Sequence, residues 1–268
     1  MIRSRYLAIF FVLLAFPAQG QDVATAIHSD QERSVDITYG GRVFGIPVMK
    51  ANISADFVGE NYAARADFRT SGLLSIFSKI QVIASASGQV KNQKLQTKEY
   101  WHKELDGRKN RELSMSYGDE LVTIRVDPPL YSMGDPPASM QQRLEALDPV
   151  SAILALAVTN VTDQQCNSTI KVFDGKQRYD LRMQAGEVKT IRTRAYKGKA
   201  LRCQVWYVPV AGFDADDLAN PEDYQKPVIM WLSKSKDSEF QIPVRFEAKL
   251  SFGTAVIEAR KIEIKSAR

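Results

Sequence analysis

The stretch MKANISADFVGENYAARADF, residues 49–68, decides the fold. In 49–57 every second residue is apolar, and polar side chains stand between them. After a Gly-Glu-Asn turn at 59–61, the same alternation resumes in 62–68. A period of two places all apolar side chains on one face of a β-strand. Two such runs around a short turn therefore predict a hairpin with one dry face and one wet face.

Further short runs that suit strands, many of them alternating, fill much of the remaining chain, with Gly, Asn and Asp residues between several of them. They cover 80–90, 95–101, 111–117, 121–126, 169–173, 178–184, 201–208, 228–232, 242–250 and 254–264. Short turns between strands favour antiparallel pairing. We therefore predict a mainly β protein, in which a long antiparallel meander curls into a partial barrel around one or two short helices, with one disulfide.

The clearest helix signal lies in the middle of the chain. Asp148 can cap a helix, Pro149 suits its first position, and the residues that follow, 150–158, are all apolar except one serine. A helix that is apolar all round must be buried, so we expect it against the concave face of the sheet. An amphipathic segment, 138–147, precedes it, and 71–77 is interpreted as a short turn or helix between strands.

A proline-rich loop divides the strands into two groups. Residues 127–137 hold four of the eleven prolines, and proline cannot donate the backbone hydrogen bond that a central strand requires. We interpret this loop as the connection between two halves of one sheet. A boundary between two domains is the alternative, but one half alone would leave its apolar face bare.

The first twenty residues have the layout of a secretory signal peptide. Arg3 and Arg5 supply a positive start, residues 6–16 are uncharged, and small residues precede Gln21. This apolar run is too short to cross a bilayer, which takes about 20 residues. We predict cleavage before Gln21, so that residues 1–20 are removed and the mature chain is exported to the periplasm.

Cleavage would leave a chain of a size that suits one large β domain. Small residues at 24–26 offer a later cut, and the segment 21–35 is expected to be flexible. The curled domain is predicted to span 36–268. The formal charge falls from +5 to +3 once the two signal-peptide arginines are removed. The remaining basic residues are scattered along the chain, so no nucleic-acid surface is expected. No later stretch is apolar enough to predict a transmembrane anchor.

The two cysteines, Cys166 and Cys203, are expected to form a disulfide, because an even pair in an exported protein usually does. The bridge would close a loop of about 37 residues, which stabilises the folded state by roughly 4 kcal/mol in the chain-entropy model. Two free thiols, the alternative, would be unusual in an oxidising compartment.

No established catalytic pattern occurs in the sequence. The chain has two histidines, His28 and His102, and it lacks the Gly-x-Ser-x-Gly, His-Glu-x-x-His, Cys-x-x-Cys and phosphate-loop motifs. A pair of carboxylates could still serve a glycosidase. The candidates are Asp148, Asp174, Asp180, Glu247 and Glu258. Each has a simpler interpretation as a helix cap, a turn residue or a solvent-facing strand residue, so we predict no catalytic residues, no metal site and no cofactor.

Several short motifs appear in order from about residue 36 to the C-terminus. They are YGGRV (39–43), GIPV (45–48), RTSGL (69–73), LDPVSA (147–152), CNST (166–169), FDGKQRYDL (173–181), CQV (203–205) and PVAG (209–212). As a set they resemble the bacterial domain-of-unknown-function family 3108, which is common in α-proteobacterial envelopes. The resemblance implies no assigned reaction. It implies a fold similar to the periplasmic lipoprotein carriers LolA and LolB, in which a long antiparallel sheet curls around helices, and it carries no catalytic residues across.

The leading hypothesis is a non-catalytic periplasmic envelope protein that binds a lipid, an acyl chain or a lipoprotein segment. A curled sheet with an apolar concave face can hold such a ligand if its helix leaves space. The predicted lining residues are Met49, Ile53, Phe57, Tyr62, Phe68, Phe246 and Leu250. The alternative for each of them is simple packing in a closed core.

Two other functions stay open on the sequence alone. An envelope scaffold could bind a protein partner or peptidoglycan through the wet strand faces or the proline-rich loop. Trp206 and Trp231, which stand opposite the main apolar set of their strands, could contact a sugar or a lipid. The third hypothesis is a hydrolase that depends on the carboxylates named above.

Overall fold

The computed structural model describes residues 32–72, 75, 80–92, 94–105, 110–158, 165–219, 225–233, 240–250 and 253–265. The strands are β1 (Glu32–Val43), β2 (Ile46–Val58), β3 (Asn61–Thr70), β4 (Gln81–Lys91), β5 (Lys94–Leu105), β6 (Asn110–Tyr117), β7 (Val122–Asp127), β8 (Thr169–Phe173), β9 (Arg178–Arg192), β10 (Lys197–Ala211), β11 (Val228–Ser233), β12 (Pro243–Leu250) and β13 (Gly253–Lys265). The helices are α2 (Met140–Leu144), α3 (Pro149–Val158) and the 3-10 helices η1 (Gln165–Asn167) and η2 (Ala215–Leu218).

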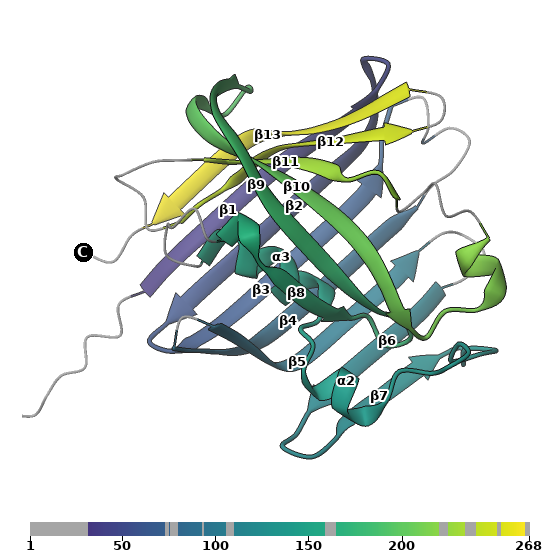
Figure 1. The fold of residues 1–268 in the computed structure, drawn as a ribbon. Helices are drawn as coiled ribbons and strands as arrows, with labels where there is room; N and C mark the ends of the chain where they lie inside the picture. The colour runs from purple at the N-terminus through teal and green to yellow at the C-terminus, as the bar shows by residue number, and fades with distance from the viewer. Residues whose placement is uncertain are drawn as a thin grey trace, which may run out of the picture.

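The strands of the described residues form one antiparallel sheet. Their order is β7-β6-β5-β4-β3-β2-β1-β13-β12-β11-β10-β9-β8, so the first and last described strands, β1 and β13, pair in the middle. All other neighbours are consecutive in the sequence, because short turns favour hairpins. The sheet is not closed, since β7 and β8 are its edges. Figure 1 shows the sheet curling around α3, which confirms the predicted mainly β, curled meander.

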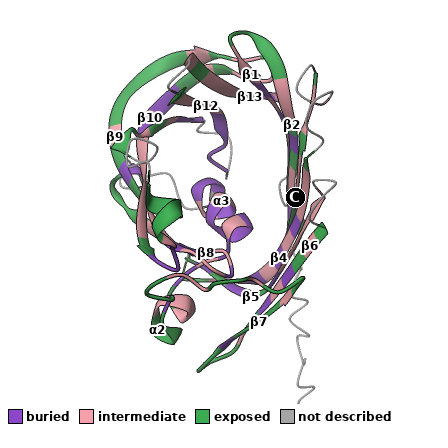
Figure 2. Ribbon diagram, turned by 90° about the vertical axis from the view of Figure 1, so that its right-hand side faces the viewer, coloured by how far each residue is buried: buried purple, intermediate pink, exposed green. Residues whose placement is uncertain are grey.

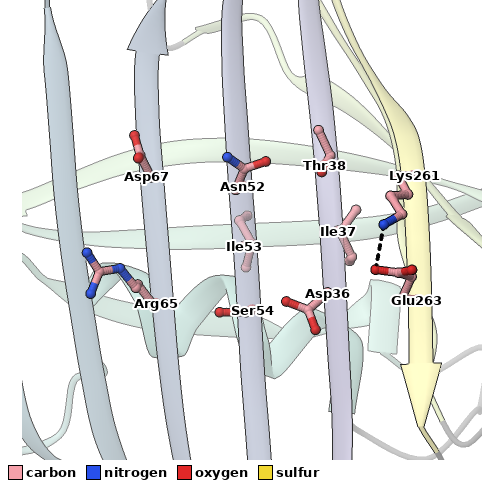
Figure 3. A pocket seen from close by; sticks show the side chains of 10 residues that line it. All are labelled: Asp36, Ile37, Thr38, Asn52, Ile53, Ser54, Arg65, Asp67, Lys261 and Glu263. Atoms are coloured by element: carbon pink, nitrogen blue, oxygen red, sulfur yellow. Dashed lines mark ion pairs between the residues drawn. The ribbon is translucent and has the colours of Figure 1, made fainter.

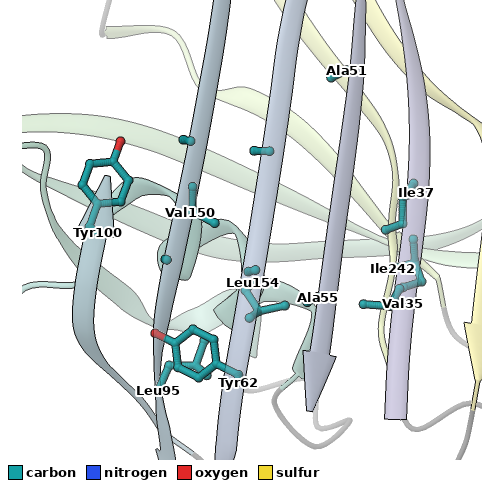
Figure 4. Close-up of a cluster of buried hydrophobic side chains, with 14 of the residues drawn as sticks. Val35, Ile37, Ala51, Ala55, Tyr62, Leu95, Tyr100, Val150, Leu154 and Ile242 are labelled. Carbon is teal, nitrogen blue, oxygen red and sulfur yellow. The ribbon is translucent and has the colours of Figure 1, made fainter. Parts of the chain in front are cut away.

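The helix α3 lies on the concave inner face of the sheet (Figure 2). It contacts β3, β4, β5 and β8. Small side chains leave room for it, because the inner face of β2 to β4 is rich in alanine. These buried alanines are Ala51, Ala55, Ala64, Ala66, Ala84 and Ala86. Figure 4 shows Val150 and Leu154 of α3 among Tyr62, Leu95 and other buried side chains of the sheet, so the apolar helix is buried as its sequence predicts.

Two segments cover the seam between the edge strands. Leu147 forms a parallel bridge with β8: its N–H donates to the carbonyl of Lys171, and the N–H of Phe173 donates to the carbonyl of Leu147, both at 2.9 Å. The short helix α2 packs on β7. An uncovered edge would be a template for pairing with another chain, and this coverage removes much of that exposure.

The proline-rich loop 127–137 packs against the end of β10. The N–H of Asp135 donates to the carbonyl of Phe213 (3.0 Å), and the N–H of Gly212 donates to the carbonyl of Pro136 (2.8 Å). Gly134 and Gly212 meet at this contact, where a Cβ on Gly134 would lie 2.1 Å from the carbonyl carbon of Gly212. The loop therefore connects β7 to α2 while it also braces the second half of the sheet.

The predicted disulfide joins Cys166 of η1 to Cys203 of β10, with their Cα atoms 5.5 Å apart. Both cysteines are buried in an apolar cluster that includes Leu156 of α3 and Met230 of β11. The bridge therefore fixes the segment that follows α3 to the wall of the curled sheet.

Some strands begin earlier or run further than the alternation predicts. β1 begins at Glu32, so residues 32–35 lie in the sheet and not in a flexible segment. β9 and β10 have 15 residues each, well beyond the predicted 178–184 and 201–208, because they pair along a long ladder whose outer part is mostly polar.

Some predictions fall on parts of the chain that the structure does not describe. The signal peptide 1–20 and its cleavage site lie outside the described residues, as does most of the segment 71–77. Within the described part of the chain, no helix has the length and apolar character needed to cross a membrane.

Candidate ligand-binding mouth

One end of the curled sheet is filled by packed side chains, and we call it the plugged end. Phe57 of β2 packs against Phe240, with ring centroids 5.6 Å apart, and both side chains are buried. The N–H of Gln241 donates to the carbonyl of Ala157 near the C-terminal end of α3 (2.9 Å). Residues 240–242, the described part of the segment before β12, therefore close over both the sheet and the helix.

A buried polar network anchors the first turn of α3. Oδ1 of Asp148 accepts hydrogen bonds from the N–H groups of Val150 and Ser151, both at 2.9 Å. Its Oδ2 accepts one from the Thr97 hydroxyl (2.7 Å), and the hydroxyls of Tyr62 and Ser151 are 2.7 Å apart. Burial raises the pKa of Asp148, and the hydrogen bonds oppose that rise. The predicted role of Asp148 as a helix cap is confirmed.

Burial falls along β12 toward the opposite end of the sheet, which we call the open end. Val244 is 0% exposed, Phe246 is half-buried, and Leu250 is 38% exposed. The β1–β2 turn and the β12–β13 ends form this part of the molecule, at the upper right of Figure 1. An apolar set that is sealed at one end thus becomes accessible to solvent at the other.

Four neighbouring strands place a row of residues at the open end, and we call it the mouth row. It consists of Met49 (β2), Gly41 (β1), Ile257 (β13) and Phe246 (β12), each paired with the next across the sheet. The three side chains pack against the core but are only half-buried. A Cβ on Gly41 would lie 3.0 Å from the Sδ of Met49, so the glycine lets Met49 lie across β1.

The predicted lining residues fall into two groups. Phe57 and Tyr62 are buried at the plugged end, so they line no opening and belong to the packed core. The other five are partly or largely exposed: Met49, Ile53, Phe68, Phe246 and Leu250. Alternation alone could not separate the groups, because residues of both kinds obey the same period of two.

Two members of the mouth row, Gly41 and Ile257, were absent from the predicted lining. A glycine inside an alternating strand indicates close approach of another group, so Gly41 did carry a usable signal. Ile257 carried none, because Val256 beside it is also apolar and nothing in the local pattern sets Ile257 apart.

Structural contacts occupy two of the candidate catalytic carboxylates in the β8–β9 hairpin. Asp174 accepts hydrogen bonds from the N–H groups of Lys176 (2.9 Å) and Gln177 (2.7 Å), as a turn residue does. Burial raises its pKa, while these hydrogen bonds oppose the rise. Asp180 accepts a hydrogen bond from the guanidinium of Arg178 (2.7 Å).

The other two carboxylates belong to a cluster on β12 and β13. Glu247 accepts a hydrogen bond from the indole N–H of Trp231 (3.1 Å) and lies 2.9 Å from the guanidinium of Arg245. Glu258 pairs with Arg42 and also lies 3.6 Å from Arg245. Glu258 is buried, which corrects its interpretation as a solvent-facing residue. Trp231 is buried as well, so it presents no sugar-binding platform.

A separate polar hollow of about 460 Å³ lies over β13, β1, β2 and β3 (Figure 3). Its polar lining includes Asp36, Thr38, Asn52, Ser54, Arg65 and Asp67. Lys261 and Glu263 border it and form an ion pair at 2.8 Å. Charges of both signs and hydroxyl groups suit a polar ligand and not an acyl chain.

These features define a class of protein: one curled antiparallel sheet that is not closed, with a buried helix on its concave face. The chain belongs to the family described as "Protein of unknown function (DUF3108)", which matches residues 34–260. This match confirms the resemblance that the sequence motifs indicate. No curated protein matches the chain.

Two solved structures resemble the fold. One is a β-barrel-like protein of domain of unknown function DUF1849 from Brucella abortus, 11% identical, with a TM-score of 0.50, covering 87% of this chain and 98% of that one. The other is a presumptive lipoprotein from Parabacteroides distasonis ATCC 8503, 9% identical, with a TM-score of 0.35, covering 86% of this chain and 95% of that one. At such identities the first similarity concerns the fold alone, and the second is weaker still.

Proposed function

We propose that this chain is a non-catalytic envelope protein that holds a lipid or an acyl chain in the mouth of its curled sheet. The observation that carries the proposal is the mouth row, where Met49, Ile257 and Phe246 are apolar, face inward and are only half-buried. Covering apolar surface contributes about 25 cal/mol per Å². An acyl chain could supply that cover, and the flexible thioether of Met49 could adapt to chains of different shape.

A periplasmic location is part of the proposal. The disulfide between Cys166 and Cys203 supports it, because such bonds form and persist in oxidising compartments. The signal-peptide layout of residues 1–20 supports it independently.

The absence of catalysis is also proposed. Its support is that each of the five candidate carboxylates already serves a cap, a turn or an ion pair, as described above. A hydrolase that uses Asp148 would need to release it from the hydrogen bonds that begin α3. The hydrolase hypothesis would be revived by a hydrolytic activity of the wild type that both Asp148→Asn and Glu258→Gln abolish while the two variants stay folded.

Native mass spectrometry of protein purified from the periplasm tests the lipid proposal. We expect a reproducible extra mass that organic solvent removes. Met49→Trp, which fills the mouth, should abolish the extra mass. Val58→Trp, on the exposed outer face of the same strand, should retain it. A bare wild-type protein that also fails to bind an added fluorescent fatty acid would overturn the proposal.

A second candidate function is favoured by the outer polar hollow. An envelope scaffold could bind a peptidoglycan fragment or a polar protein segment there, because Arg65, Asp36 and the neighbouring hydroxyls offer donors and acceptors. Co-sedimentation with purified peptidoglycan would support this role if Arg65→Ala reduced it. Unchanged co-sedimentation of this variant would remove the hollow as the binding site.

A further inference from the structure

Four large apolar side chains are exposed at the open end, and we call these four residues the apolar rim. Phe44 in the β1–β2 turn is 69% exposed, Ile46 at the start of β2 is 45% exposed, and Ile80 just before β4 is 44% exposed. Leu250 at the end of β12, at 38%, completes the set. Exposed apolar groups that gather in one place on a protein surface commonly mark an interaction site.

Contacts between the turns bring Phe44 close to Leu250 and fix Ile80 at the same end of the sheet. The ring of Phe44 covers Gly253, where a Cβ would lie only 2.5 Å from it, and Gly253 pairs with Leu250. The N–H of Thr70 donates to the carbonyl of Ile80 (2.9 Å), which places Ile80 beside the end of β3. Figure 1 shows the β1–β2 turn and the ends of β12 and β13 side by side.

Cations flank the apolar rim. Lys50 and Arg69 stand directly opposite each other on β2 and β3, and Lys249 precedes Leu250; all three are exposed. Each Lys or Arg close to an anionic membrane contributes about 1 kcal/mol of attraction. These three cations are therefore positioned to be attracted to an anionic membrane surface.

Two glutamates close to the rim, on β12 and β13, already pair with arginines. Glu258 pairs with Arg42, and Glu247 lies beside Arg245. Arg42, Arg245 and Glu258 line a hollow that Phe44 also borders, so Glu258 has a cationic partner there. Lys50, Arg69 and Lys249 add exposed positive charge to this end.

We propose that the apolar rim docks on an anionic lipid surface, with Phe44 and Ile46 entering the bilayer interface. Bulky apolar tips flanked by lysine and arginine are the combination that such an interface favours. Docking would also bring the mouth row to the lipid: Ile46 is three residues from Met49 on β2, and Leu250 is four from Phe246 on β12. This inference rests on the proposed lipid-binding function. It adds the surface at which a lipid would pass between the membrane and the mouth row.

Co-sedimentation of the periplasmic protein with vesicles tests the docking. We expect binding to vesicles that contain phosphatidylglycerol, weaker binding to pure phosphatidylcholine, and a decrease with added salt. The double variant Phe44→Ser with Ile46→Ser should bind about tenfold or more weakly, because two inserted apolar side chains are lost. Lys50→Glu with Arg69→Glu should remove the preference for anionic vesicles.

A matched control exists at the plugged end. Lys91 and Lys94 are exposed and stand opposite each other on β4 and β5, as Lys50 and Arg69 do on β2 and β3. Lys91→Glu with Lys94→Glu should leave vesicle binding unchanged. Equal loss in both charge variants would show general attraction without a docking site, and it would overturn the inference.

Two further outcomes separate this inference from the proposed function. Protein that carries lipid in native mass spectrometry but ignores anionic vesicles would refute the docking and leave the function standing. Protein that binds vesicles through the rim but never carries lipid would refute the proposed lipid-binding function and leave the docking standing. A dimer in analytical ultracentrifugation that Phe44→Ser dissolves would make the rim a self-association surface, against the docking.

Discussion

The plugged end and the open end are built from the same strands but differ in what covers them. Phe57 and Met49 stand on one face of β2, yet Phe57 is sealed beneath Phe240 while Met49 is only half-buried. The cover at the plugged end comes from α3 and from the segment before β12. The comparison teaches that alternation determines which face of a strand is apolar, and that segments distant in the sequence determine whether that face is core or binding surface.

The largest expected effect tests this comparison directly with two phenylalanines. Phe57→Ala should lower the free energy of unfolding by about 3–5 kcal/mol, because it leaves a cavity in a sealed core. Phe68→Ala on β3 should cost about 1–2 kcal/mol, because its side chain is already partly in water. Urea unfolding of both variants measures the difference. Equal losses would mean that the open end is packed as tightly as the plugged one.

Removal of the disulfide should have the next largest effect. We expect Cys166→Ser with Cys203→Ser to lose about 2–4 kcal/mol, because the bridge limits the freedom of the unfolded chain. Since the bridge ties down the segment behind α3, hydrogen exchange should rise first in α3 and not at the mouth row. A double variant as stable as the wild type would show that packing alone holds the plug.

Protonation of Asp148 gives a smaller, pH-dependent effect. Burial raises its pKa in the folded state, so the folded protein keeps this proton to higher pH than the unfolded chain. Stability from Asp148 is therefore greatest below the ordinary Asp pKa of about 3.9 and is lost as pH rises through the raised folded value.

Urea unfolding between about pH 4 and pH 8 would measure this contribution of Asp148 to stability. The reference is the variant Asp148→Asn, whose residue 148 cannot titrate. The stability of the wild type relative to this variant should decrease as pH rises. Asp174, whose pKa burial also raises, is common to both proteins and cancels. A difference that does not change with pH would contradict the assignment.

The smallest expected effect is at the rim. Phe44→Ser should change the free energy of unfolding by no more than about 0.5 kcal/mol, as exposed substitutions generally do, whereas it should weaken vesicle binding clearly. Thermal unfolding without vesicles measures the first quantity. A large loss of stability would mean that the contact of Phe44 with Gly253 holds the two turns together.

Much of the fold could be predicted from local pattern. The hairpin at 49–68, the buried helix after Asp148 and the disulfide follow from periodicity, capping and cysteine count, and the structure confirms all three. The first strand, β1, was missed. Residues 32–35 were expected to be flexible, and no strand was predicted for residues 36–43. The outer half of β9 and β10 was missed because mostly polar residues pair there along a ladder with little apolar signal.

The candidate site could be predicted only in part. The inward-facing apolar set was found, but Phe57 and Tyr62 were grouped with Met49 and Phe246. Only the fold separates them, because Phe240 lies more than 180 positions after Phe57 in the sequence and reaches it through the closing of the sheet.

The sequence by itself determined most of the strands, their wet and dry faces, the buried helix and the crosslink, since these depend on neighbours a few residues apart or on residue type. The tertiary structure alone decided that the sheet stays open, that α3 and the segment before β12 fill one end, and that Gly41, Ile257 and Phe246 meet at the other. The physical reason is that burial is a property of space: a side chain is covered by whatever the whole chain places above it, and period-two alternation contains no information about that cover.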